Sequence, residues 1–238
     1  MNKLYIVGTP IGNLEDITFR ALRVLGEVDF VLCEDTRVTK KLLDRHNIKV
    51  PTISYHQHSK ASKTNYIFGL LKEGKNLALV SDSGTPGISD PGGRLVKEVV
   101  NKLEGEVLIE SVPGPSAVTT ALSVSGFPAD SFLFLGFPPH KKGRQKFLSR
   151  IIASEGPVVA FESKHRILKF LNELKNMFEE QEAKNKTQEP QVVVCRELSK
   201  MHEKIYRGGV GEIIKKLDPE QGGSKDDQKG EFVVIIYQ

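Results

Sequence analysis

Residues 81–93 read Ser-Asp-Ser-Gly-Thr-Pro-Gly-Ile-Ser-Asp-Pro-Gly-Gly, and this stretch decides the fold class that we expect. It follows the apolar run 76–80, which predicts a buried strand, and precedes residues 94–103, which predict a helix. Its glycines let the backbone turn sharply and approach a ligand closely. In open α/β sheets, glycine-rich loops at the carboxyl ends of strands hold small molecules. The stretch therefore predicts an α/β fold with a ligand site at this loop.

The charge of the loop narrows the class of ligand. The loop carries Asp82 and Asp90, and no Lys or Arg appears before Arg94. A phosphate site needs amide hydrogens and a nearby cation. Carboxylates repel phosphate, whereas they accept hydrogen bonds from ribose hydroxyls and tolerate a cationic ligand. The alternative is a tight solvated turn, and Asp90-Pro91 also suits the start of a helix.

The composition predicts a packed globular protein of 238 residues, with 39% hydrophobic and 27% charged residues. The apolar runs are too short to cross a membrane, and the first residues do not resemble a signal peptide. Cys33 and Cys195 are far apart in the sequence, which predicts two free thiols and a reducing cytoplasm. The net charge of +4 permits a nucleic-acid partner without requiring one.

Strands and helices alternate in the first half of the chain. This order predicts an N-terminal α/β domain, residues 1–114, with a mostly parallel sheet and helices on both faces. The break at Pro113-Gly114-Pro115 marks its end. The expected strands are 3–8, 28–33, 76–80 and 107–110, and the expected helices are 16–26, 36–45, 63–73 and 94–103.

The second half alternates with different spacing, so we expect a C-terminal α/β domain, residues 115–238, with a mixed sheet. Two polar stretches, 179–190 and 218–230, predict loops. The expected strands are 132–135, 158–161, 192–195, 205–208 and 232–237, and the expected helices are 116–125, 143–153, 165–177 and 210–217.

Several polar or glycine-containing segments directly follow predicted strands. Carboxyl ends of strands form the rim on which α/β folds build their sites, so these segments predict a shared crevice. They are residues 8–13, 34–37, 113–117, 161–163 and 196–199.

The segment 34–37, Glu-Asp-Thr-Arg, has two interpretations. Asp35 and Arg37 suit a structural pair at a helix start, because Asp is an ordinary cap. In the functional interpretation, Arg37 holds a substrate phosphate and a carboxylate lies near a reacting hydroxyl. His56 and His58 lie on one face of an extended segment, but no third ligand is near, so we expect no metal site.

The densest basic patch is His140-Lys141-Lys142-Gly143-Arg144-Gln145-Lys146. It lies at the predicted start of a helix, where positive charge opposes the helix dipole. This placement favours an anionic partner such as an RNA backbone over a merely solvated helix start.

Together these segments carry a resemblance that extends over nearly the whole chain. They read GTPIGNLEDIT at 8–18, EDTR at 34–37, VPGPSA at 112–117, FLGFPP at 134–139, FES-HRI at 161–167, CREL-K at 195–200 and KGEF at 229–232. With the loop at 81–93, the sequence resembles the bacterial 16S ribosomal RNA cytidine 2′-O-methyltransferases of the tetrapyrrole-methylase-like superfamily. It departs from their pattern at Ser83, Lys164 and Ser199.

The resemblance implies S-adenosylmethionine as methyl donor, bound in a cleft between two α/β domains, and a homodimer. Carried onto this chain, it implies that the donor is held by residues from both halves of the sequence. These are Pro10, Asp82, Gly84, Thr85, Ile88, Ser116, Ala117, Phe161, Glu162, Arg196, Glu197, Leu198, Gly230 and Glu231.

The implied reaction is transfer of a methyl group to the 2′-hydroxyl of a cytidine in the decoding region of 16S rRNA, as free RNA or in the small ribosomal subunit. Glu34 and Asp35 are the first candidate bases, and His56 or His58 stands behind them. Arg37 is the third catalytic candidate. Candidate RNA contacts are Arg37, His56, His58, Lys141, Lys142, Arg144 and Lys146. The alternatives are a tetrapyrrole (porphyrinoid) C-methyltransferase and a non-catalytic RNA-binding ribosome assembly factor.

Overall fold

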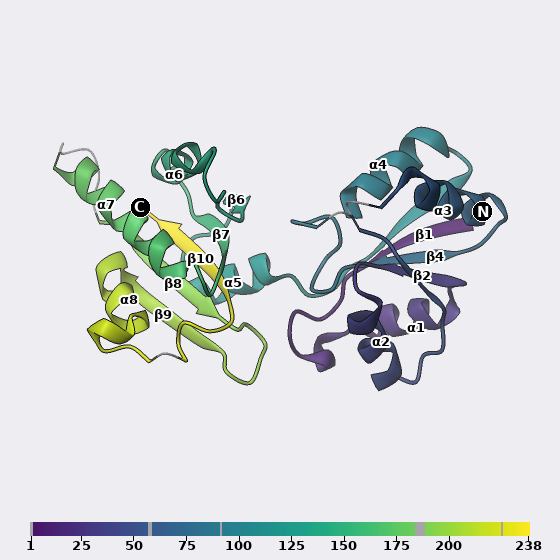
Figure 1. Cartoon of the computed structure of the whole chain (residues 1–238), viewed down its shortest axis with the longest axis horizontal. Helices are drawn as coiled ribbons and strands as arrows, with labels where there is room; N and C mark the ends of the chain where they lie inside the picture. The colour runs from purple at the N-terminus through teal and green to yellow at the C-terminus, as the bar shows by residue number, and fades with distance from the viewer. Residues whose placement is uncertain (1, 57–58, 91, 184–188, 225) are drawn as a thin grey trace. The chain divides into compact units, whose positions relative to one another are not determined.

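The chain divides into two compact units, Met1–Ser116 and Ala117–Gln238 (Figure 1). A computed structural model describes residues 2–56, 59–90, 92–183, 189–224 and 226–238. The division falls after Ser116, whereas the sequence predicts a domain boundary after Gly114. Within the described ranges, no helix is both long enough and apolar enough to span a membrane.

The first unit contains a five-stranded sheet in the order β3-β2-β4-β1-β5, and every neighbouring pair is parallel. The strands are β1 (Asn2–Val7), β2 (Phe30–Cys33), β3 (Thr52–Ser54), β4 (Leu77–Val80) and β5 (Val107–Val112). The helices are α1 (Phe19–Glu27), α2 (Thr36–Arg45), α3 (Ala61–Lys72) and α4 (Gly92–Lys102), and the short 3₁₀ turn η1 covers Leu14–Asp16.

Each face of this sheet carries its own apolar core, so the unit has three layers. Leucines of β1 and β4 pack against α3 and α4, whereas Val7 and Val80 face α1 and α2 (Figure 1). The sequence predicted helix 16–26, but α1 begins later because the Thr18 side chain accepts a hydrogen bond from Ala21 N and caps the helix. Strand β3 was not predicted, since three residues are too few to show a period.

The order of the strands creates a crevice at their carboxyl ends. Strands β1 and β4 are neighbours, yet α1 follows β1 on one face of the sheet and α4 follows β4 on the other. Loops that leave adjacent parallel strands in opposite directions open a ligand site between them. The residues after β1 and after β4 are therefore where this unit places a site.

The second unit contains a mixed sheet in the order β6-β7-β10-β8-β9, in which only β6 and β7 pair in parallel. Its strands are β6 (Leu133–Gly136), β7 (Val158–Ser163), β8 (Gln191–Arg196), β9 (Lys204–Gly209) and β10 (Glu231–Tyr237). Its helices are α5 (Ala117–Ser125), α6 (Arg144–Ile152), α7 (Ile167–Glu182) and α8 (Val210–Leu217), with the 3₁₀ turn η2 at Pro219–Gln221. The α/β class and both sheet types predicted from the sequence are confirmed.

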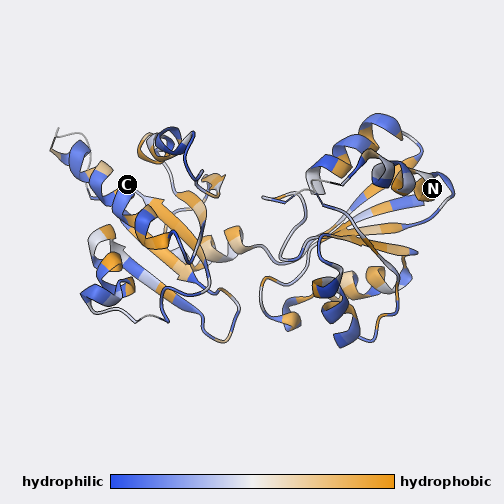
Figure 2. Ribbon diagram, in the orientation of Figure 1, coloured by the Kyte–Doolittle hydropathy of each residue, from blue (hydrophilic) through white to orange (hydrophobic). Residues whose placement is uncertain are grey.

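The core of the second unit lies between the sheet and the helices α6, α7 and α8. Figure 2 shows hydrophobic residues along the strands of this sheet and a mixture of hydrophilic and hydrophobic residues along the helices. Helix α7 extends beyond its predicted end at Met177, because Phe178 is 3% exposed and packs into this core. The predicted loop therefore begins later than the polar composition suggested.

Candidate functional site

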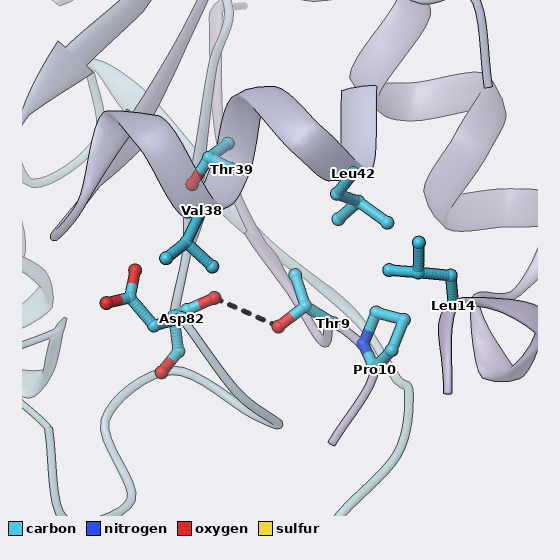
Figure 3. A pocket seen from close by; sticks show the side chains of 8 residues that line it. Thr9, Pro10, Leu14, Val38, Thr39, Leu42 and Asp82 are labelled. Atoms are coloured by element: carbon cyan, nitrogen blue, oxygen red, sulfur yellow. Dashed lines mark hydrogen bonds between the residues drawn. The ribbon is translucent and has the colours of Figure 1, made fainter. Parts of the chain in front are cut away.

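Thr9 joins the end of β1 to the glycine-rich loop after β4. Its backbone N–H donates to the Gly84 carbonyl at 3.0 Å, and its hydroxyl donates to the Ser81 carbonyl at 3.0 Å (Figure 3). The side chain is buried, so both bonds lie away from solvent. These contacts hold the first residues of the two loops side by side at the crevice.

A small pocket opens beside Thr9. It has a volume of about 50 Å³ and is lined by Thr9, Pro10, Leu14, Val38, Thr39, Leu42, Ser81 and Asp82. In Figure 3, Leu14 and Leu42 lie at one end of the pocket and the Asp82 carboxylate at the other. This volume holds a few water molecules or a small group such as a methyl or a hydroxyl, whereas a whole nucleoside is far larger.

The glycine-rich loop is folded back on itself by Asp90. One oxygen of this carboxylate accepts hydrogen bonds from Gly87 N at 2.5 Å and from Gly92 N at 2.7 Å. Gly84 has φ +82° and Gly87 has φ +88°, conformations that favour glycine. Asp90 thus acts at the start of α4, as predicted, while Pro91 lies outside the described residues. Ile88 is half exposed.

The carboxylates of Asp82 and Asp90 lie close enough to Glu34 to affect its carboxyl group. Partial burial raises the pKa of Glu34, and the negative charges of Asp90 and Asp82 raise it further. Asp82 also accepts a hydrogen bond from the backbone N–H of Asp35 at 3.1 Å. The rim of the first unit is therefore acidic where the loops after β2 and β4 meet.

Asp35 has the structural role that the first interpretation of the sequence predicted. It caps α2 by accepting a hydrogen bond from Arg37 N at 2.8 Å, and it pairs with the Arg37 guanidinium at 2.6 Å. The hydrogen bonds from Arg37 lower the pKa of Asp35 to about 2. The Arg37 side chain is 87% exposed, so its outer face remains accessible to an anion.

Two glycines let the loops after β1 and β5 touch. A Cβ atom at Gly8 would lie 2.8 Å from the backbone of Gly114, and one at Gly114 would lie 2.7 Å from the Gly8 carbonyl oxygen. Thr85 donates from its hydroxyl to the Pro115 carbonyl at 3.4 Å. Ser116 follows this contact directly, and Ala117 is the first residue of α5.

In the second unit, the remaining residues that the sequence predicts to bind the methyl donor lie at one end of the sheet. Strand β10 pairs Glu231 with Ser163 of β7 and Phe232 with Arg196 of β8, both antiparallel. The carboxyl ends of β7 and β8 therefore lie beside the start of β10. This arrangement brings together Phe161, Glu162, Arg196, Glu197, Leu198, Gly230 and Glu231.

Glu162 carries a carboxylate oxygen without a partner among the described residues. The residue is 1% exposed; its Oε1 pairs with Arg166 at 2.8 Å and accepts from Ser163 N at 2.7 Å. Its Oε2 is buried and accepts no hydrogen bond within the described part of the chain. A buried oxygen of this kind suits a ligand that brings an N–H or O–H group.

The guanidinium group of Arg196 forms its hydrogen bonds with backbone carbonyls of the same chain. The Arg196 guanidinium donates to the carbonyls of Lys229 at 2.7 Å, His202 at 2.9 Å and Asp226 at 2.7 Å. These bonds tie the segment before β10 to the end of β8. Any ligand contact by Arg196 therefore falls to its backbone or its aliphatic stem.

Glu197 also connects the end of β8 to the start of β10. Its carboxylate accepts from Glu231 N at 2.8 Å and pairs with Lys200 at 3.0 Å. Although burial opposes the charge, these bonds hold the pKa of Glu197 below its usual range. Glu197 has φ +51°. A Cβ at Gly230 would lie 2.5 Å from the Glu197 carboxyl group, so position 230 has no room for a larger residue. Leu198 is buried.

The structure corrects one predicted RNA contact. Arg144 is 7% exposed; it pairs with Glu173 at 2.5 Å and donates to the Pro139 carbonyl at 2.9 Å. A buried, paired guanidinium cannot reach a phosphate, so Arg144 serves the fold. Lys141, Lys142 and Lys146 are exposed, as is His56, whereas His58 lies outside the described residues.

The pocket residues Val38 and Leu42 were missed from the sequence. They are one turn apart on α2 and look like ordinary core positions in a helical pattern. Only the strand order, which places the end of β1 beside that of β4, shows what they line. Within the described ranges, no three His, Cys, Asp or Glu side chains gather as a metal site would require.

Comparison with known proteins agrees with this architecture. The profile of the family Tetrapyrrole (Corrin/Porphyrin) Methylases matches residues 3–214. A protein of Thermotoga maritima named Ribosomal RNA small subunit methyltransferase I is 43% identical over 99% of this chain and 98% of that protein. One of the same name from Bacillus subtilis is 40% identical over 99% of this chain and 75% of that protein.

Solved structures show the same fold at low sequence identity. The methyltransferase CobJ has a TM-score of 0.68 at 14% identity and covers 100% of this chain and 95% of its own. Cobalt precorrin-4 methyltransferase has a TM-score of 0.67 at 20% identity and covers 99% of this chain and 94% of its own. The family expected from the sequence is confirmed: the chain belongs to the tetrapyrrole methylases, in the group formed by ribosomal RNA small subunit methyltransferase I.

Proposed function

We propose that this chain methylates the 2′-hydroxyl of a cytidine ribose in the decoding region of 16S rRNA, with S-adenosylmethionine as donor. Membership of the ribosomal RNA small subunit methyltransferase I group supports the donor and the class of RNA. The observation that carries the ribose chemistry is the acidic rim formed by Glu34, Asp82 and Asp90. When bound, S-adenosylmethionine supplies a methyl group on a positively charged sulfur.

The residues present fit such a donor. Carboxylates on the glycine-rich loop tolerate a cationic sulfonium, and Asp82 suits ribose hydroxyls. The unpartnered Glu162 Oε2 suits an amino group. We therefore propose that the donor is held by Pro10, Asp82, Gly84, Thr85, Ile88 and Ser116 from the first unit and by Ala117, Phe161, Glu162, Arg196, Glu197, Leu198, Gly230 and Glu231 from the second. The predicted cleft between the units stays a prediction.

Glu34 is the better of the two candidate bases. A base works best when its pKa lies near the operating pH. The pKa of Asp35 is lowered to about 2 by Arg37, which makes Asp35 a weak proton acceptor. Burial and two neighbouring carboxylates raise the pKa of Glu34 instead. We assign proton acceptance to Glu34, while Asp35 orients the exposed Arg37 toward a phosphate of the RNA.

Positioning of the ribose hydroxyl and the methyl donor accounts for most of the expected rate enhancement. Holding two reacting groups in line contributes about 7–11 kcal/mol. The hydrogen bonds of Thr9 to the loop after β4 and the cap made by Asp90 fix the rim on which the hydroxyl must sit.

The test incubates the protein with methyl-labelled S-adenosylmethionine and unmodified small ribosomal subunits, then maps ribose methylation by nuclease digestion and mass spectrometry. We expect label on one cytidine 2′-oxygen, a loss of turnover of at least about a hundredfold in Glu34→Gln, and a smaller loss in Asp35→Asn. Label on a porphyrinoid ring and none on RNA would identify a tetrapyrrole methylase. RNA binding without methyl transfer would identify an assembly factor.

We also propose that the chain acts as a homodimer in the cytoplasm. The two buried free thiols, Cys33 and Cys195, support a reducing compartment. Light scattering coupled to size-exclusion chromatography tests the dimer, and a mass of one chain across the working concentration range would refute it.

A further inference from the structure

An aromatic cluster projects from the end of strand β6. The Phe161 ring lies 5.0 Å from the Phe134 ring and 5.4 Å from the Phe137 ring, both close to edge-to-face. Phe137 is nevertheless 52% exposed. A large apolar ring left in water forgoes the free energy of burial, so this exposed ring is available to pack against a partner.

The backbone after Phe137 is held firmly. Arg166 donates to the Pro138 carbonyl at 2.9 Å, and Arg144 donates to the Pro139 carbonyl at 2.9 Å. Both arginines are themselves fixed by ion pairs with glutamates on neighbouring elements. Two prolines in succession restrict the same segment further. Phe137 is therefore presented on a rigid support, which lowers the entropy cost of binding.

A row of cations follows Phe137 along the chain. We call Lys141, Lys142, Lys146 and Arg150 the α6 ridge; all four are exposed. Within the described part of the chain none of them forms an ion pair, and residues 131–154 contain no Asp or Glu. Lys146 and Arg150 are four residues apart on α6, so they lie on one face, with the buried Phe147 and Ile151 turned toward the core.

The stability of α6 does not explain this charge. Gly143, at the N-cap, makes no side-chain cap, and the first turn carries no acidic residue. Lys141 and Lys142 lie just before the helix, where positive charge opposes the dipole. Figure 2 shows the hydrophilic stretch that leads into α6. An anionic partner that uses these cations accounts for their placement.

We propose that Phe137 and the α6 ridge form a track for a single-stranded segment of the RNA substrate. Phe137 stacks on one base, and the ridge holds the phosphates that follow. Exposed aromatic rings beside unpaired cations are how proteins bind single strands, whereas a duplex keeps its bases stacked on each other. The proposal rests on the proposed function, since it specifies how the RNA is held.

The ridge is tested by salt dependence. Binding to unmodified small ribosomal subunits is measured over a salt series for the wild type, Lys146→Gln/Arg150→Gln and the matched control Lys215→Gln/Lys216→Gln, which removes equal charge from α8. Each cation that holds a phosphate of a single strand contributes about 0.7 to the slope of log K against log salt, so the ridge variant should lose about 1.4. The control should keep the wild-type slope. Equal slopes in all three proteins would overturn the proposal that the α6 ridge binds phosphates of the RNA.

The stacking is tested with Phe137→Leu and Phe137→Tyr. Leu keeps apolar packing but cannot stack, so we expect affinity for a labelled single-stranded RNA to fall about tenfold, while Tyr restores it. Affinity for S-adenosylmethionine, measured by calorimetry, should be unchanged in both. A loss of donor affinity with RNA binding intact would assign the ring to the donor site and overturn the proposal. Because these are binding measurements, they stand even if methyl transfer to ribosomal subunits fails.

Discussion

The contact between Gly8 and Gly114 gives the sharpest test of how the first unit builds its rim. The change Gly114→Ala adds one methyl group, 2.7 Å from the Gly8 carbonyl oxygen and 2.9 Å from its carbon. Both neighbours are backbone atoms, so no flexible side chain can move aside. Overpacking of this kind costs about 1–3 kcal/mol. At about 2–4 °C per kcal/mol for a chain of this size, the melting temperature should fall by several degrees.

The same change should reduce activity beyond its effect on stability. Gly8 leads into Thr9, whose hydrogen bonds to Ser81 and Gly84 are 3.0–3.2 Å long. A shift of a few tenths of an ångström at Gly8 stretches these bonds and moves the rim. Since a displacement near 1 Å can cost about a hundredfold in rate, we expect turnover to fall about tenfold at a temperature where the variant stays folded.

The matched control is Gly26→Ala in α1. A Cβ at Gly26 would meet nothing within 4 Å, so the same methyl group should stabilise the protein by about 0.4–1 kcal/mol. Calorimetric melting and methyl transfer are measured on both variants. If Gly114→Ala melts and turns over like the wild type, the reasoning from the glycine contact is wrong.

Three further changes test separate features. Asp90→Asn removes a negative charge that raises the pKa of Glu34. The acidic limb of the pH profile of kcat/KM should therefore move to lower pH, because a base with a lower pKa stays ionised at lower pH. An acidic limb that does not move would show that Glu34 is not the base. Gly230→Ala places a Cβ 2.5 Å from the Glu197 carboxyl at φ +104°, so it should cost about 1–3 kcal/mol and weaken donor binding in calorimetry. Lys142→Glu should stabilise α6 by about 0.5–1 kcal/mol in thermal melting yet weaken RNA binding; weakened RNA binding without stabilisation would contradict the dipole argument.

The elements were predictable where local chemistry sets them. Helices α2 and α8 have the bounds expected from the sequence, since Asp35 caps the first and a regular apolar stripe defines the second. Strand β3 was missed because it has three residues. The end of α7 was placed too early because Phe178, which packs into the core, stands beside acidic residues.

The site was predictable as a set of rim segments but not as a set of contacts. Strand-end motifs indicate which loops meet, because the carboxyl ends of parallel strands share one edge. They do not show that Arg144 is buried against Glu173, 29 residues further along the chain. Nor do they show that Arg196 donates to three carbonyls of its own chain. In both cases a charge visible in the sequence is used by a partner that only the fold brings near.

The charge of this chain explains why an acidic surface for the methyl donor and a basic surface for RNA are both needed. The balance of 34 basic and 30 acidic residues gives a net charge of only +4, which predicts weak attraction to RNA. The acidic rim around Glu34 suits a cationic donor, but it repels the phosphates that flank the ribose. Affinity for RNA must therefore come from exposed cations, and we propose Arg37 and the α6 ridge for this role. Removing the ridge should then weaken RNA binding while leaving donor binding intact, whereas neutralising the rim should weaken donor binding without weakening RNA binding.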